Sequence, residues 1–248
     1  MNEQKPIIYT LKFLLISLLS AIVIFGIGVT FERLIEKRLE NDSLPTYIKA
    51  NTISVVIDAG HGGEDAGAIA PDGTLEKDLN LEISNLVKAL CILNGINVKM
   101  TRENDMLLYD YYNDLENYTG QKKVYDLKNR LKIAEEHPSA LYVGIHMNKF
   151  SQAKYKGTQI YYSKNNEESQ LVASDLSKKI KSYLQPENNR QIKGADSSIY
   201  ILNNIKNPAI LVECGFLSNE EELSSLKDEE YRASLALLIF ASICEYNS

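Results

Sequence analysis

The chain has 248 residues, with 27 Lys and Arg against 33 Asp and Glu, so its formal net charge is −6 at pH 7. This charge argues against a nucleic-acid-binding protein, because neutralising phosphates requires a basic surface. The 44% hydrophobic content excludes intrinsic disorder, and the length fits one folded domain with a short additional segment. Three widely spaced cysteines (Cys91, Cys214 and Cys244) exclude a disulfide framework, and we expect Cys91 and Cys244 to be buried free thiols.

The N-terminal part contains a long apolar run at residues 13–31, without a single charged side chain. A helix of that length is about 28 Å long, which is enough to cross a hydrocarbon core. The run lacks both the polar stripe of a core helix and a clear small-x-small cleavage site, so it predicts an uncleaved membrane anchor within 1–31, with a cleaved signal peptide as the alternative. Basic residues flank the run on both sides and leave its orientation open. Residues 32–51 are predicted to form a charged stalk.

From residue 52 onward, short β-branched runs alternate with longer helical stretches, which is typical of an α/β domain. We therefore expect one domain over 52–248, with a single mixed or parallel sheet flanked by helices. The expected strands are 53–58, 96–101, 140–145, 157–162 and 209–213. The expected helices are 76–93, 125–136, 167–184, one opened by a capping-box pattern at 218–221, and an amphipathic helix at 229–246. A polar, tyrosine-rich insertion at 103–124 has no clear periodicity.

Side chains suited to metal binding gather where the expected strands end, and ligands bind beyond the carboxyl ends of strands in open α/β sheets. Strand ends deliver His61, His146 and Glu213, and Glu76 stands where a Gly-rich loop enters a helix. Two His and one carboxylate, with a fourth position left to water, form a zinc set used by hydrolases. A second carboxylate is then needed as general base. Spacing alone leaves open which glutamate binds the metal and which is the base.

Ordinary structural explanations compete with this chemical one. A His beside glycines is often a plain loop residue, and a Glu at a helix start can serve only the helix dipole. Glu213 differs, because it lies in the apolar run 209–217, where an unpaired carboxylate is costly. His137, which precedes Pro138 in a polar turn, is expected to be a solvent-facing loop residue.

Several motifs, taken together, resemble a known enzyme family. They are VVIDAGHGGEDAGA at 55–68, EKDLN at 76–80, TR at 101–102, GIHMN at 144–148 and LVECGFLSN at 211–219. In this order they resemble the zinc-dependent N-acetylmuramoyl-L-alanine amidases of the amidase-3 type, and the similarity covers the chain from residue 53 onward. Gly144 is a small departure, because many members have Ser there.

The resemblance implies a zinc-exopeptidase-like α/β fold, one Zn²⁺ bound by His61, Glu76 and His146, and Glu213 as the catalytic glutamate. It also implies the substrate, which is the amide between N-acetylmuramic acid and L-alanine in peptidoglycan. The anchor, the single domain and the stretch 195–202 are similar to the spore-cortex amidases. We therefore expect a membrane-anchored enzyme whose domain lies outside the cytoplasm and acts in sporulation or germination.

Four further assignments concern residues outside the donor set. Asp58 is a candidate for orienting a metal-bound imidazole, and the alternative is that it only tightens its turn. Arg102 and Lys193 are candidates for binding the carboxylates of the stem peptide, although a solvated surface charge is the simpler explanation. The insertion 103–124 is a candidate docking surface for a targeting or activating protein, against an ordinary packed loop.

Two other functions compete with the amidase. A non-catalytic peptidoglycan-binding scaffold is expected to have lost a ligand or the base, whereas this chain keeps all four residues. A zinc carboxypeptidase uses a similar donor set but needs an arginine that clamps a terminal carboxylate, and the sequence identifies none.

Overall fold

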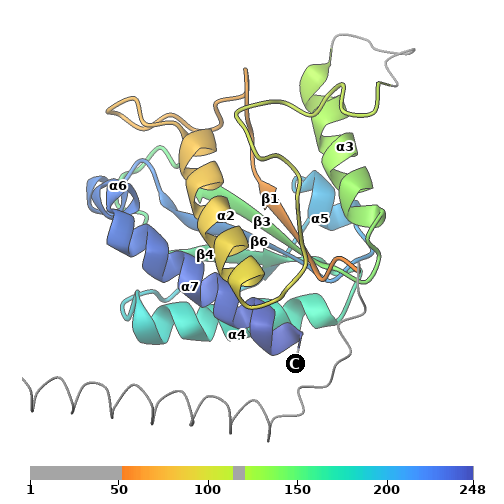
Figure 1. Ribbon diagram of the computed structural model, residues 1–248. Coiled ribbons are helices and arrows are strands. Elements are labelled where there is room, and N and C mark those ends of the chain that lie inside the picture. The colour runs from red at the N-terminus through yellow and green to blue at the C-terminus, as the bar shows by residue number, and fades with distance from the viewer. Residues whose placement is uncertain (1–51, 114–120, 248) are drawn as a thin grey trace, which may run out of the picture. The chain divides into compact units, whose positions relative to one another are not determined.

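The computed structural model describes residues 52–113 and 121–247 (Figure 1). The apolar run 13–31 and the stalk 32–51 lie outside the described residues. Within the part of the chain that is described, no helix combines the length and the apolar character that a membrane crossing requires.

A mixed sheet of six strands forms the centre of the described domain, in the order β2-β1-β3-β6-β4-β5. The strands are β1 (Val55–Ala59), β2 (Val98–Met100), β3 (Leu141–Asn148), β4 (Gln159–Tyr162), β5 (Lys193–Gly194) and β6 (Ala209–Phe216). Strands β2, β1, β3 and β6 are parallel, whereas β4 runs antiparallel to β6 and parallel to β5. The prediction of a single mixed sheet is confirmed.

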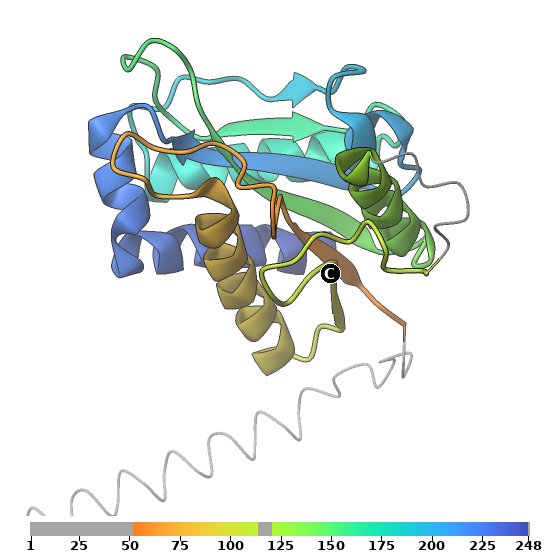
Figure 2. The ribbon, with the colours of Figure 1, turned by 90° about the horizontal axis from the view of Figure 1, so that it is seen from above.

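Helices cover both faces of this sheet (Figures 1 and 2). The helices α2 (Glu76–Leu93), α4 (Glu168–Tyr183) and α7 (Glu229–Tyr246) pack on one face, and α3 (Lys122–Glu135) and α5 (Tyr200–Asn204) pack on the other. The short helix α6 (Glu220–Lys227) connects β6 to α7. Because the central strands are buried on both faces, they appear in the sequence as continuous apolar runs.

Several predicted boundaries need correction. Helices 76–93 and 229–246 match to the residue, but α3 begins at Lys122 instead of 125. Strands β3 and β6 extend to Asn148 and Phe216, each three residues beyond the predicted end. The cap of α6 is Asn219, not Ser218, because the Asn219 side chain accepts from the Glu222 amide. β5 and α5 are too short to have left a periodic signal.

Helix α7 is not amphipathic as predicted, because it packs beside both α2 and α4. It buries Leu235, Ala236, Ile239 and Ile243 in the core. The three cysteines are free, and Cys91 and Cys214 are buried, but Cys244 is only partly buried.

A buried ion-pair network surrounds Asp58, which lies near the carboxyl end of strand β1. Asp58, which is 1% exposed, receives hydrogen bonds from Arg130 Nη1 and Thr101 Oγ1 on one oxygen and from Tyr142 Oη on the other, each at 2.6 Å. Burial raises the pKa of this carboxyl, but Arg130 and the two hydroxyls outweigh burial and lower it to about 2. Asp58 is therefore ionised and fully paired inside the domain.

Substitution of Asp58 by Asn is expected to destabilise the domain by about 3–5 kcal/mol, because it removes one of the two buried carboxylates that pair with the Arg130 charge. The pKa of Asp58 lies below its ordinary value of 3.8, so its stabilising contribution is complete above pH 3.8 and is lost as the pH falls through about 2. Urea unfolding at neutral pH measures the loss. The matched control is Glu103→Gln, which breaks the exposed pair with Lys88 and should cost under about 1 kcal/mol. Equal effects of the two substitutions would contradict this assignment.

Candidate metal centre

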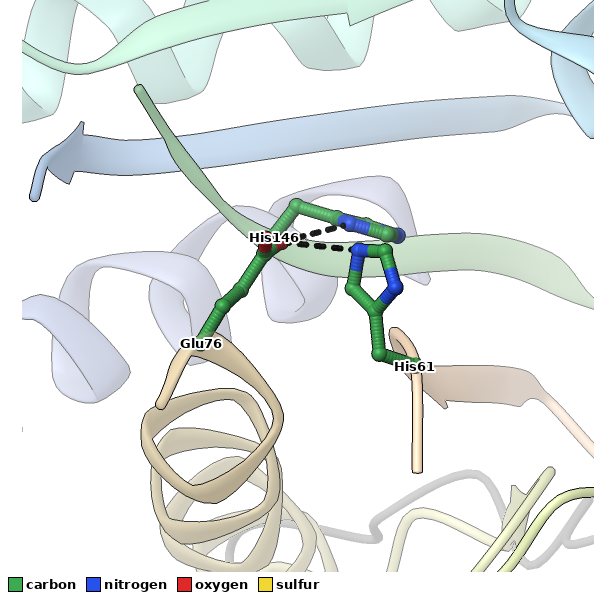
Figure 3. A group of neighbouring side chains, drawn as sticks. All are labelled: His61, Glu76 and His146. Carbon is green, nitrogen blue, oxygen red and sulfur yellow. Dashed lines mark hydrogen bonds and ion pairs between the residues drawn. The ribbon is translucent and has the colours of Figure 1, made fainter. Parts of the chain in front are cut away.

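Three of the predicted site residues meet at the carboxyl edge of the sheet (Figure 3). One ligand atom from each of His61, Glu76 and His146 lies within 4.8 Å of the others. Glu76 Oε1 is 3.2 Å from His61 Nε2 and 3.0 Å from His146 Nδ1. Two nitrogen or oxygen ligands of one tetrahedral zinc ion are separated by about 3.3 Å. The donor set therefore fits such an ion without rearrangement of the backbone.

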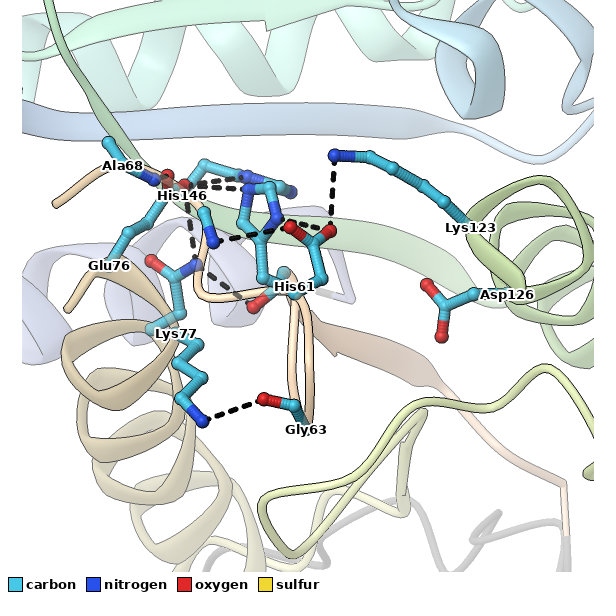
Figure 4. Close-up of polar contacts among 12 residues, drawn as sticks. His61, Gly63, Ala68, Glu76, Lys77, Lys123, Asp126 and His146 are labelled. Carbon is cyan, nitrogen blue, oxygen red and sulfur yellow. Dashed lines mark hydrogen bonds and ion pairs between the residues drawn. The ribbon is translucent and has the colours of Figure 1, made fainter. Parts of the chain in front are cut away.

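Asp65 orients the imidazole of His61, which Figure 4 shows beside Glu76 and His146. Its Oδ2 atom is 2.8 Å from His61 Nδ1 and 3.1 Å from Lys123 Nζ. The bond to Asp65 occupies Nδ1, so Nε2 of His61 faces Glu76. Burial lowers the pKa of His61, but the bonds to Asp65 and Glu76 outweigh it and raise this pKa to about 9 in the metal-free protein.

The loop that carries His61 is a tight turn with unusual backbone geometry. His61 itself has a φ of 62°, which L side chains rarely adopt. Gly62 and Asp65 exchange two backbone hydrogen bonds of 3.0 Å, and Arg130 Nη2 donates to the His61 carbonyl at 2.6 Å. Lys77 Nζ adds a bond of 2.9 Å to the Gly63 carbonyl. These bonds hold His61 in a conformation that the isolated loop would not keep.

Glu76 enters the centre from the first turn of α2. Its Oε2 accepts from the Ala68 amide at 2.7 Å, and its Oε1 accepts from the Met147 amide at 3.0 Å. Burial opposes ionisation, but the contacts with His146 and His61 outweigh burial and lower the pKa of Glu76 well below its ordinary range. The carboxylate is thus anionic and fixed between the two imidazoles.

Two glycines are required by the close approach of the backbone to these side chains. A Cβ on Gly60 would lie 2.2 Å from Cε1 of His146. A Cβ on Gly67, whose φ is +67°, would lie 2.6 Å from Oε2 of Glu76. The glycine-rich sequence before α2 therefore makes room for the ligands.

Glu213 lies in register with His146 on the neighbouring strand, and Gln159 lies in register with Glu213 on the next strand. The three residues thus form a row across β3, β6 and β4. The Oε2 atom of Glu213 is buried and has no hydrogen-bond partner in the described part of the chain. Burial raises the pKa of Glu213 to about 7 in the metal-free protein.

The other predicted site residues have different positions. Asp58 does not reach an imidazole, because its oxygens are taken by Arg130, Thr101 and Tyr142, and Asp65 has the predicted orienting role instead. Sequence reasoning missed Asp65, although its place four residues after His61 was a usable signal.

Arg102 is 2% exposed and donates to the carbonyl oxygens of Ala59, Gly60, Lys77 and Asn104, so it is not available to a substrate carboxylate. Its role is to hold the backbone that precedes His61. Lys193 is exposed on β5, in register with Tyr161, and its predicted contact with the stem peptide stays a prediction. His137 is partly exposed in a turn after α3 and takes no part in the cluster.

An α/β sheet with a His-Glu-His donor set and a buried glutamate one strand away defines a metallohydrolase. The chain belongs to the N-acetylmuramoyl-L-alanine amidase family Amidase_3, which matches residues 55–245. It is 32% identical over 192 residues to the germination-specific N-acetylmuramoyl-L-alanine amidase of Bacillus subtilis (strain 168), and the match covers 77% of this chain and 78% of that protein.

Solved structures of N-acetylmuramoyl-L-alanine amidases are also similar to this chain. The CwlD amidase from Clostridioides difficile, in complex with the GerS lipoprotein, aligns with a TM-score of 0.72 and 38% identity over 79% of this chain and 98% of that chain. The amidase AmiC2 of Nostoc punctiforme aligns with a TM-score of 0.66 and 28% identity over 79% and 97%. The recognition of the family, and of the spore-cortex amidases within it, is confirmed.

Substitution of Gly60 by Ala is expected to displace the His146 imidazole and to weaken metal binding at this centre on the order of 10- to 100-fold. The physical reason is that the new Cβ would lie only 2.2 Å from Cε1 of that ring, which is far shorter than a van der Waals contact. Competition with a chromophoric chelator measures the affinity. Gly144→Ala on β3 is the matched control, because its Cβ would lie at an ordinary 3.4 Å from Tyr142 and 3.5 Å from Leu211. An unchanged metal affinity in Gly60→Ala would contradict the assignment of His146 as a ligand.

Proposed function

We propose that this chain is a zinc-dependent amidase that hydrolyses the bond between N-acetylmuramic acid and L-alanine during maturation of the spore cortex. The convergence of His61, Glu76 and His146, in a chain that belongs to the Amidase_3 family, is the observation that carries the proposal. The similarity to a germination-specific amidase supports the cortex as the place of action.

The choice of zinc rests on the chemistry of the donors. Two imidazole nitrogens and one carboxylate oxygen suit a borderline-soft ion, and three protein ligands leave one position for water. When bound, zinc would polarise the scissile carbonyl and lower the pKa of the water. His61, Glu76 and His146 would hold the ion, and Asp65 would keep Nε2 of His61 directed at it.

In this proposal, Glu213 acts first as the general base and then as the proton donor. Its carboxylate takes a proton from the attacking water as the new carbon–oxygen bond forms. It then gives that proton to the alanine nitrogen as the carbon–nitrogen bond breaks, which yields a lactyl carboxylic acid and a free amine. The buried and unpartnered Oε2 atom supports this role, because a carboxylate in such a place has no evident structural function.

The two rival functions have less support. A non-catalytic scaffold does not explain why all four chemical residues are present and three of them converge. A carboxypeptidase needs an arginine for the terminal carboxylate of its substrate. The arginines in the described residues all donate hydrogen bonds or ion pairs to groups of the chain itself; they are Arg102, Arg130, Arg190 and Arg232.

The location follows from the substrate. Peptidoglycan lies outside the cytoplasmic membrane, so we place the domain 52–248 there, held by the anchor within 1–31 through the stalk 32–51. We also propose a targeting or activating protein partner, since a similar amidase was solved in complex with a lipoprotein. Within 103–124, Tyr111 and Tyr112 contact Lys99 and Lys132 of this domain, which supports a packed loop more than a docking surface.

Glu213→Gln should keep the fold and the bound zinc but lower turnover by roughly 10²- to 10⁴-fold, because the amide cannot accept the proton of water. Glu76→Gln should instead weaken zinc binding. Mass spectrometry of digested peptidoglycan measures the release of stem peptides, and metal analysis separates the two variants. Near-normal release by Glu213→Gln would remove this residue from the mechanism.

Export of the domain is tested on intact protoplasts. Added protease should degrade the region after residue 50 while the cells remain closed, because that region is expected to lie outside the membrane. A cytoplasmic protein followed in the same sample is the control for lysis. Protection of the domain until the protoplasts are lysed would place it inside the cell and would contradict the proposed location.

A further inference from the structure

We propose that Phe150 forms a sugar-stacking subsite that binds the glycan strand of the substrate beside the metal centre. This inference rests on the proposed amidase function and names the part of the substrate that this surface recognises. Its basis is a column of aromatic rings that ends in an exposed ring close to the site.

The column has a buried base and an exposed top. Phe216 at the end of β6 is 3% exposed, and the Arg190 guanidinium lies 4.4 Å from its ring centroid. Tyr155 lies 6.4 Å from Phe216, and Phe150 contacts Tyr155 edge to face at 4.7 Å. Phe150 is 49% exposed. The lower rings therefore support Phe150, which presents half of its surface to solvent.

Hydrogen bonds hold the segment that carries Phe150 against the rest of the domain. The Phe150 amide donates to Ser218 Oγ at 3.1 Å, and Lys149 Nζ donates to the Ile69 carbonyl at 2.7 Å. Asn219 Nδ2 donates to the Ala153 carbonyl at 2.7 Å. Figure 2 shows the connection between β3 and β4 projecting past the ends of the strands. An exposed aromatic ring held by a fixed loop loses little conformational entropy when a ligand covers it.

The backbone of Phe150 lies near the proposed metal centre. Phe150 is four residues beyond His146 on the same chain segment, and Phe216 is three residues beyond Glu213. At about 3.3 Å per residue, Phe150 lies at most about 13 Å from His146 along the strand direction. A groove of about 610 Å³ opens beside the same loop, and Ala153, Leu217 and Ser218 are among its lining residues.

The exposed ring of Phe150 matches a sugar better than a charged peptide. The scissile amide is joined to its sugar ring through the lactyl group, so sugar rings must lie next to the centre. A pyranose presents an apolar C–H face, which packs on an aromatic ring in the same way as other flat apolar groups. The stem peptide carries carboxylates, for which an uncharged phenyl ring offers no partner.

The first test is a binding measurement that does not require catalysis. The chain contains no Trp, so Phe150→Trp in the full-length protein introduces its single tryptophan at the proposed subsite. Titration with peptide-free oligosaccharides of N-acetylglucosamine and N-acetylmuramic acid should change the emission in a saturable manner. The matched control is Leu171→Trp on α4, where the native side chain is 71% exposed on the helical layer, and it should show no saturable change. No response from Phe150→Trp, or equal responses from both, would overturn the inference.

The second test distinguishes stacking of a sugar on the aromatic ring from burial of any apolar side chain at position 150. Phe150→Ala should raise KM for glycan-bearing substrate about tenfold, with kcat and zinc affinity changed less than about twofold. Phe150→Tyr keeps the ring and should restore KM, whereas Phe150→Leu is apolar without a ring and should not. An unchanged KM in Phe150→Ala would refute the subsite while leaving the amidase proposal intact. A native chain that releases no stem peptide would refute the amidase proposal, and the fluorescence titration would still report on the subsite.

Discussion

The buried guanidinium of Arg130 connects helix α3, strand β1 and the loop that carries His61. It donates to Asp58 Oδ1 at 2.6 Å, to the carbonyl oxygens of Ala59 at 2.8 Å and His61 at 2.6 Å, and to Asp126 Oδ2 at 2.7 Å. A buried charge is tolerated only when such partners surround it. The position of His61, the first proposed metal ligand, therefore follows from an ion-pair network that contains none of the proposed ligand atoms, and the strained His61 backbone depends on the same network.

Arg130 stabilises the domain, whereas Glu213 has a proposed chemical role that opposes the stability of the domain. Burial raises its pKa to about 7, and its Oε2 atom has no partner in the described chain. Above that pH the metal-free domain must hold an ionised carboxylate in a poorly solvated place, which opposes folding. Such a group persists when it serves a reaction and the rest of the core compensates for it. The apolar strand β6, buried along most of its length, supplies that compensation.

The sequence predicted the architecture and the convergence of the donors, because parallel strands bring their carboxyl ends to one edge regardless of loop detail. It did not distinguish Asp58 from Asp65 as the partner of His61, because that choice depends on how the Gly62 turn folds back. The prediction that Arg102 is available to a substrate carboxylate was wrong for a related reason. A basic residue after a strand looks available to a ligand, and only the packed structure shows that backbone carbonyl groups surround it. The apolar surface of α7 likewise depends on its two helical neighbours.

The position of β6 between β3 and β4 has a consequence for the order of folding. The three donor residues lie within the first 146 positions, and strands β1 and β3 that carry or precede two of them pair directly. Glu213 comes from a later strand that must enter between two earlier ones. During synthesis the donors are therefore complete well before the residue proposed to move protons. A chain that ends before β6 therefore contains the three proposed metal ligands but lacks the carboxylate proposed to move protons, and we expect it to be hydrolytically inactive.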